Sequence, residues 1–149
     1  LGALKYFDLS HYRNSDYVFR WDEALSFDGN SGPYLQYTHA RLKSILRKIG
    51  GSEKAPEGVS MDDLEHRLTV AVLRFPEVVE DALKDFSPST LANYLFNLAR
   101  LANEFYHSHP VAQEENEAKR KLRIALVAAV ALTLSRGLYL LGIEAPEEM

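Results

Sequence analysis

The spacing of apolar residues constrains the fold of this chain more than any other feature of its sequence. After residue 30 the apolar residues recur every three or four positions, and no segment of any length alternates with the two-residue period of a strand. This spacing gathers the apolar side chains of each segment on one face of an α-helix. Because proline and glycine separate the segments, we predict an all-α fold, a bundle of about five helices with short connections.

Start and stop signals define the first two helices. Pro33 is placed in the first turn of a helix that Gly50-Gly51 ends, and a loop is expected over residues 52–59. Ser60 and Asp63 have the spacing of a capping box, which opens the second helix. Its predicted inner face comprises Leu64, Leu68, Ala71, Val72 and Phe75.

Two prolines and a glycine delimit the other three helices. Pro76 ends the second helix and can start a third. Ser87-Pro88 starts a fourth helix, which ends near residues 107–110, and the last is expected from about residue 118 to residue 141, before Gly142. The predicted inner face of the third helix comprises Val78, Val79, Ala82, Leu83 and Phe86.

Residues 1–29 differ from the helical remainder, residues 30–149. They are rich in aromatic residues but have no sustained 3.6-residue period, so we expect irregular or briefly extended structure with a short helical turn near residues 22–26. This segment has the character of a connecting region that packs against something. Its aromatic residues are Tyr6, Phe7, Tyr12, Tyr17, Phe19, Trp21 and Phe27.

Composition excludes some classes of site and leaves others open. The 149 residues, 46% hydrophobic, suit one domain with a real core, and the absence of cysteine excludes disulfides and thiolate chemistry. A net charge of −4 does not by itself indicate a nucleic-acid binder, so such a role needs local basic faces. The longest uncharged apolar run, residues 124–135, is shorter than the roughly 20 residues of a membrane span and predicts a buried core helix.

No group of residues has the spacing of a catalytic or metal site. His107 and His109 are the one close histidine pair, and a spacing of two does not place both rings on one helix face. No third ligand follows at metal-site spacing, and no phosphate-binding glycine loop or nucleophile elbow occurs. We expect no catalytic residue and no metal ligand in this chain.

Three stretches of the chain carry a longer and more specific pattern. The first runs from Lys5-Tyr6-Phe7-Asp8 through Ser15–Phe19 and Trp21-Asp22 to Leu25–Tyr37; the second comprises Ser87-Pro88-Ser89, Leu91–Leu95 and Asn103–His107; the third extends from Arg123–Leu126 through Gly137-Leu138 to Leu140–Met149. Together they resemble the C-terminal region of arginyl-tRNA synthetases. Two positions depart from the family pattern, because Glu148 replaces a common arginine and Ala102 a usual phenylalanine.

The resemblance implies a DALR-type anticodon-binding domain over residues 30–149, preceded by the end of a class I catalytic domain, or connector, over residues 1–29. The parent would be an arginine–tRNA ligase that uses ATP and Mg²⁺. This chain lacks both class I signature motifs, so we expect it to be inactive alone and to hold no cofactor. The implied partners are arginine-specific tRNA and the parent's own catalytic domain, with no membrane or DNA partner, in the cytoplasm. The final residues resemble the natural C-terminus of family members.

The resemblance also suggests which side chains meet the anticodon. Its loop is single-stranded, so its bases can stack on aromatic rings and be read at their edges. Tyr106 matches a family position where a ring meets the anticodon, and Met149 matches one that approaches it. The alternatives are a tyrosine at the rim of the core and a frayed tail. Asn103, Arg100 and His109 are further candidates, with a solvated helix face as the alternative.

Two basic clusters are candidates for contact with the tRNA backbone. Positive charge at a helix start is unfavourable to the helix dipole, which makes the start of the last helix the better candidate: Lys119, Arg120, Lys121 and Arg123. Arg41 and Arg47 belong, with Lys43 and Lys48, to the cluster on the first helix, where the dipole alone could explain Arg47 and Lys48. We expect the anticodon contacts to converge where the fourth and fifth helices meet. The rival hypothesis is a helical protein–protein docking module with no RNA role, which the negative net charge and residues 1–29 favour.

Overall fold

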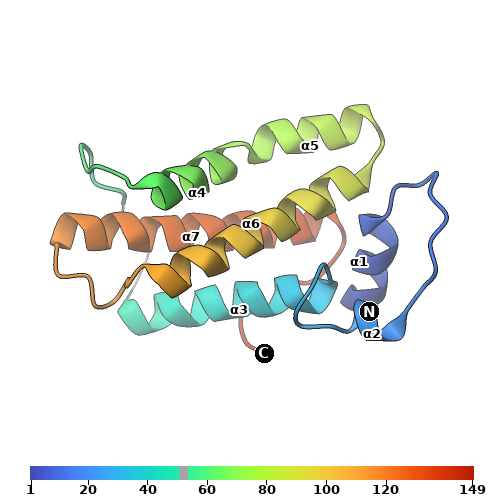
Figure 1. Cartoon of the computed structure of the whole chain (residues 1–149), viewed down its shortest axis with the longest axis horizontal. Helices are drawn as coiled ribbons and strands as arrows, with labels where there is room; N and C mark the ends of the chain where they lie inside the picture. The colour runs from blue at the N-terminus through green and yellow to red at the C-terminus, as the bar shows by residue number, and fades with distance from the viewer. Residues whose placement is uncertain (51–53) are drawn as a thin grey trace.

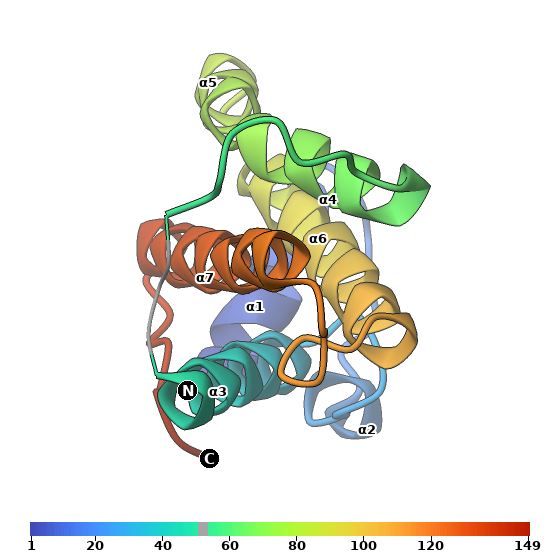
Figure 2. The same cartoon turned by 90° about the vertical axis from the view of Figure 1, so that its left-hand side faces the viewer.

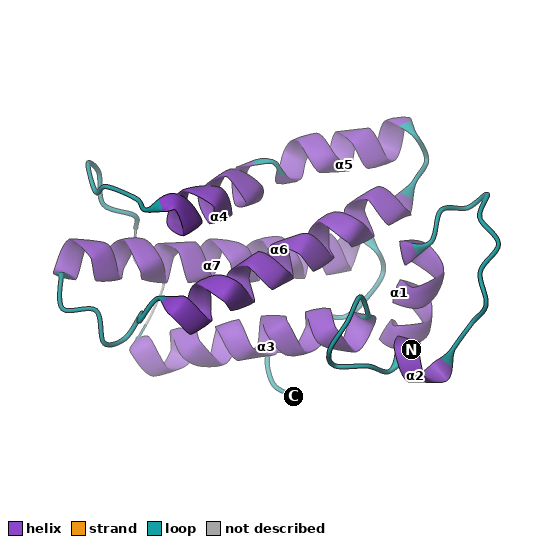
Figure 3. Ribbon diagram, in the orientation of Figure 1, coloured by secondary structure: helices purple, strands orange, loops and turns teal. Residues whose placement is uncertain are grey.

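A computed structural model describes residues 1–50 and 54–149 and shows an all-α protein (Figure 1). Within the described residues there are helices and no strand (Figure 3). The five predicted helices of residues 30–149 are confirmed as α3 to α7, and two shorter helices precede them. The bounds are α1 Gly2–Ser10, α2 Trp21–Ala24, α3 Gly32–Ile49, α4 Asp63–Leu73, α5 Phe75–Lys84, α6 Pro88–Ser108 and α7 Glu117–Leu140.

The long helix α7 contributes much of the buried core of the bundle. Seen from one end it lies between α3 and α4, with α6 beside it, and it contacts all three (Figure 2). By length and composition it could cross a membrane, but 61% of its most apolar window is buried inside the bundle. Its apolar residues therefore fit the predicted core helix.

The expected signals at both ends of α3 are confirmed. The Ser31 hydroxyl accepts a hydrogen bond from the Tyr34 amide, and Pro33 occupies the first turn. Gly50 has φ 92° and donates its amide to the Leu46 carbonyl, which is the left-handed stop that glycine favours. Gly51 and the first two residues of the predicted loop over 52–59 lie outside the described residues.

The start of α4 corrects the predicted capping box. Asp62 caps the helix in place of Ser60: its Oδ1 accepts from the Glu65 amide at 3.0 Å, and Glu65 Oε2 accepts from the Asp62 amide at 3.0 Å. Two residues with capping chemistry stand close together here. Asp62 is the cap and Ser60 is not, because the buried Glu65 side chain can accept a hydrogen bond from the Asp62 amide.

The predicted inner face of α5 is wrong at its C-terminal end. Leu83 and Phe86 are 70% and 72% exposed, whereas Val78 is buried. Helix α5 lies at the edge of the bundle and packs mainly on α6, so only a narrow strip of its surface is covered (Figure 1). Phe86 follows the helix with φ 47°.

Residues 1–29 contain a helix that the sequence analysis missed. Helix α1 buries Ala3, Tyr6 and Phe7 against the bundle, and the Tyr6 hydroxyl lies 2.6 Å from Asn30 Oδ1 and 2.9 Å from the Ala92 carbonyl. Burial raises the pKa of Tyr6. Nine residues are too few for a helical period to show in the sequence. The short helical turn expected near residues 22–26 is present as α2, and the connection between α1 and α2 is irregular.

Candidate nucleic-acid interface

Tyr106, near the C-terminal end of α6, lies between two surface grooves. Its ring is half-buried, and the Arg41 guanidinium of α3 stands 4.9 Å from the ring centroid. This is the geometry of a cation–π contact, which orients the ring and keeps a positive charge beside it. A partly exposed ring next to a cation suits an aromatic, anionic ligand such as a nucleotide.

The first groove has a volume of about 520 Å³ and lies between α3, Tyr106 and the C-terminal residues. Three of its side chains carry positive charge and one carries negative charge, so the groove is locally basic although the whole chain is acidic. It is lined by Tyr37, Ala40, Arg41, Ser44, Ile45, Arg47, Lys48, Tyr106, Glu148 and Met149.

The second groove, of about 310 Å³, lies on the loop side of Tyr106. It shares Ile45, Lys48 and Tyr106 with the first groove. The Tyr106 ring and the Lys48 side chain therefore border both grooves. Its other residues are Ile49, His109, Pro110, Val111, Ala112 and Gln113. Neither groove has Asn103, Arg100 or a residue of α7 in its lining.

The residues after α7 return along α3, which places Met149 in the first groove. The side chains of Gln36 and His39 bond to the carbonyls of Glu144 and Pro146, each at 2.8 Å. Further along the same helix face, Arg47 donates both terminal nitrogens to the Glu147 carbonyl at 3.2 Å. Burial lowers the pKa of His39. The final residues are therefore held on α3 by side chains from one face of that helix.

Asn103 and Arg100 have other neighbours. The Asn103 amide donates to the Tyr34 hydroxyl at 2.8 Å and lies 3.4 Å from the Thr38 hydroxyl, which joins α6 to α3. Arg100 is exposed, with its guanidinium 5.9 Å from the Phe96 ring centroid. Asn103 thus supports the face of α3 that carries the groove.

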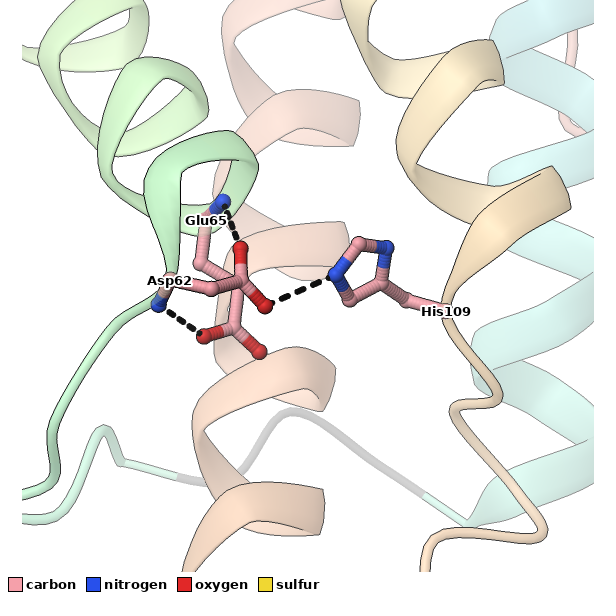
Figure 4. Close-up of side chains that lie close together, drawn as sticks. All are labelled: Asp62, Glu65 and His109. Carbon is pink, nitrogen blue, oxygen red and sulfur yellow. Dashed lines mark hydrogen bonds and ion pairs between the residues drawn. The ribbon is translucent and has the colours of Figure 1, made fainter.

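His109 lines the second groove, and one of its ring nitrogens faces Asp62 (Figure 4). Its ring stacks on Phe105 with centroids 5.0 Å apart, Nε2 lies 2.8 Å from Asp62 Oδ2, and Nδ1 lies 2.7 Å from the Ser108 hydroxyl. Partial desolvation opposes ionisation of Asp62, yet hydrogen bonds from the Glu65 amide and His109 keep the pKa of Asp62 below its usual value.

The predicted phosphate-binding role of Lys119 and Arg123 is not compatible with their positions. Arg123 is 7% exposed, and its Nε donates to Glu65 Oε1 at 2.8 Å, while Nη1 donates to Glu114 Oε2 at 2.6 Å. The Lys119 ammonium donates to Glu65 Oε2. Desolvation opposes ionisation of Glu65, but these two cations hold its pKa below its usual value. A buried carboxylate on α4 therefore explains the positive charge at the start of α7.

The other two members of that cluster face outward. Lys121 pairs with Glu117 at 2.8 Å, and Arg120 is exposed. The basic groove forms between α6, α3 and the C-terminal residues, so the structure does not bring these basic residues of α7 into the groove beside Tyr106, where the fourth and fifth helices were expected to converge. The sequence could not reveal this, since it does not show where the residues after α7 run.

Asp62, Glu65 and His109 bring three potential metal-ligating atoms within 4.8 Å of one another (Figure 4). The Glu65 oxygens are already bonded to Arg123, Lys119 and the Asp62 amide. Two cations at the same carboxylate also repel a metal ion. The cluster is better explained as a junction that ties α4 to the end of α6 and the start of α7.

Lys48 is a residue of this interface that the sequence analysis did not select as a contact residue. It borders both grooves, whereas its place in the last turn of α3 had been explained by the helix dipole. A signal was present, because Tyr37, Arg41, Ser44 and Lys48 recur at helical spacing on one face of α3.

Comparison with known proteins identifies the family. The model of the DALR anticodon binding domain matches residues 35–149. The chain belongs to this family. Over its whole length the chain is 44% identical to the arginine–tRNA ligase of Ignicoccus hospitalis and, with a few insertions, 44% identical to that of Bacteroides thetaiotaomicron. It spans 24% and 26% of those proteins, about a quarter of their length.

Solved structures agree with this assignment of the DALR domain. The arginyl-tRNA synthetase of Thermus thermophilus superimposes with a TM-score of 0.92 at 40% identity. That of Plasmodium falciparum superimposes with a TM-score of 0.83 at 30% identity. Each match covers 99% of this chain and 26% of the other, so α1 and α2 as well as the DALR helices have counterparts in these proteins.

Proposed function

We propose that this DALR domain binds the anticodon arm of an arginine-specific tRNA as the C-terminal part of an arginine–tRNA ligase. The observation that carries the proposal is the Tyr106 ring, half-exposed between two grooves and next to Arg41, in a family described as anticodon binding. Unpaired bases stack on such rings, and each stacked base contributes about 1–3 kcal/mol.

The residues divide into three roles in this proposal. Tyr106, Met149 and His109 border the grooves and contact the bases. Arg41, Arg47 and Lys48 hold backbone phosphates, as lysine and arginine do at most nucleic-acid interfaces. Asn103 positions α3 against α6, while Arg100, Arg120 and Lys121 lie farther out and contribute general attraction for an anion.

The parent protein supplies the chemistry. We propose that its catalytic domain joins arginine to tRNA with ATP and Mg²⁺ in the cytoplasm, and that this domain contributes no cofactor and no catalytic group. Residues 1–29 are proposed to belong to the catalytic domain or its connector, and residues 30–149 to form the anticodon-binding domain.

The exposed apolar side chains before α3 support docking on that catalytic domain. They form a patch of a kind that monomeric domains seldom leave uncovered. Docking by this segment is compatible with RNA binding, although the Phe27 ring contacts Tyr37 at the edge of the first groove. The patch comprises Tyr12, Tyr17, Val18, Phe19, Trp21, Leu25 and Phe27.

The test is RNA binding by the full-length protein, measured by fluorescence anisotropy with an anticodon stem-loop of arginine tRNA. Tyr106→Ala should weaken binding by about 1–3 kcal/mol. Tyr139→Ala is the matched control, because Tyr139 is 75% exposed on α7 and lies in neither groove. The proposal fails if Tyr106→Ala binds like the control, or if an unrelated stem-loop binds equally well.

A further inference from the structure

Glu148 is the one acidic side chain among the described residues that line the first groove. It lies 3.4 Å from Arg47 Nη2, and its side chain is 83% exposed, so solvent and ligand can reach it. Arg47 is also partly exposed, and its two terminal nitrogens already hold the Glu147 carbonyl. The guanidinium is therefore held in place by the backbone, while the Glu148 carboxylate takes up its charge.

A carboxylate and a phosphate compete for the same guanidinium. Both are oxyanions that accept the parallel N–H donors of arginine. The other two cations of the groove have different surroundings, because Arg41 lies over the Tyr106 ring and Lys48 borders both grooves. Arg47 is thus the groove cation that already has a carboxylate partner supplied by the chain itself.

We propose that Glu148 is an internal competitor for RNA phosphate at Arg47 and sets the affinity of the groove. RNA binding displaces the carboxylate from Arg47, and the remaining negative charge repels the phosphate that replaces it. This inference rests on the proposed binding of RNA in the first groove. It assigns to Glu148 an affinity-determining role that lowers the attraction of this site for every polyanion.

Glu147 provides a matched control one residue away. Its carboxylate pairs with Lys43 at 3.0 Å and lines a different groove, between α3 and α7. Glu147→Gln and Glu148→Gln remove the same charge from adjacent exposed positions, and only the second removes it from the neighbourhood of Tyr106. Neither change threatens the fold, because both side chains lie at the surface.

The experiment is anisotropy with the anticodon stem-loop and the full-length protein over a range of salt concentrations. Glu148→Gln should tighten binding about two- to fivefold, the size expected for an exposed ion pair. It should also steepen the slope of log affinity against log salt by up to about 0.7, the contribution of one single-strand phosphate, because the carboxylate then no longer offsets the charge of Arg47. Glu147→Gln should change both quantities less, because its carboxylate pairs with Lys43 and acts on Arg47 only through a weaker charge interaction. Glu148→Gln should lose its effect in an Arg47→Gln background.

Two results would overturn the inference. An equal gain in RNA affinity for the two glutamate variants would show a general charge effect. Unchanged affinity for Glu148→Gln would show that its carboxylate does not compete with phosphate for Arg47. Tyr106→Ala in the same series separates this failure from failure of the proposed function. If Tyr106→Ala weakens binding and Glu148→Gln has no effect, the groove binds RNA and only the competition is wrong.

Discussion

Replacing Glu65 with glutamine removes the negative charge that Lys119 and Arg123 share beneath the start of α4. Glu65 is fully buried, and glutamine keeps the shape of the side chain and an oxygen that can accept from the Asp62 amide. The change therefore isolates the charge. Removing one member of a buried ion pair costs about 3–5 kcal/mol. Because Glu114 still pairs with Arg123, we expect a loss of folding free energy at the lower end of this range, about 3 kcal/mol.

The measurement is the free energy of unfolding, from urea titration followed by circular dichroism. For a chain of this length, a loss of about 3 kcal/mol corresponds to a fall in Tm of roughly 6–12 °C. Glu117→Gln is the control, since it breaks an exposed pair with Lys121 in the first turns of α7 and should cost far less stability than Glu65→Gln.

The pH dependence gives a second readout. The folded-state pKa of Glu65 is lowered, so its contribution to stability is complete above its unfolded pKa of about 4.3 and disappears as pH falls through the folded value. The difference in stability between wild type and Glu65→Gln should shrink in acid. Equal stabilities of Glu65→Gln and Glu117→Gln at neutral pH would refute the view that this buried charge network stabilises the junction of α4 with the end of α6 and the start of α7.

Three further outcomes are expected. Gly137→Ala should destabilise the chain by about 1–3 kcal/mol in urea titration, because an added Cβ would stand 2.4 Å from a methyl of the buried Leu95; stabilisation, as at an exposed helix glycine, would contradict the packing. His39→Gln should flatten the decline in stability below about pH 6.5, since burial lowers the His39 pKa and protonation favours the unfolded chain; an unchanged pH profile would argue against it. Lys48→Gln should reduce the slope of log RNA affinity against log salt by about 0.7, and Arg120→Gln should reduce it less. A larger effect of Arg120→Gln would show that α7, and not α3, contacts the phosphates.

The two basic clusters show how far sequence reasoning reached toward the candidate site. Both were recognised as unusual, and the structure places the one that was ranked second in the groove beside Tyr106. Positive charge at the start of α7 needed an explanation, but the partner is Glu65, more than fifty residues earlier on α4. Arg47 and Lys48 on α3 seemed explained by the helix dipole, yet they border the groove beside Tyr106.

The sequence alone determined the helices, because helix formation depends on neighbours within about one turn. Apolar spacing, Pro33, Gly50 and Ser87-Pro88 identified α3 to α7, and only the nine-residue α1 was too short to show a period. Charge pairing, by contrast, depends on which helices meet. Burial of Glu65 between α4 and α7 and the return of residues 143–149 along α3 were decided by tertiary packing, and these contacts determine which cations remain available to an anionic ligand.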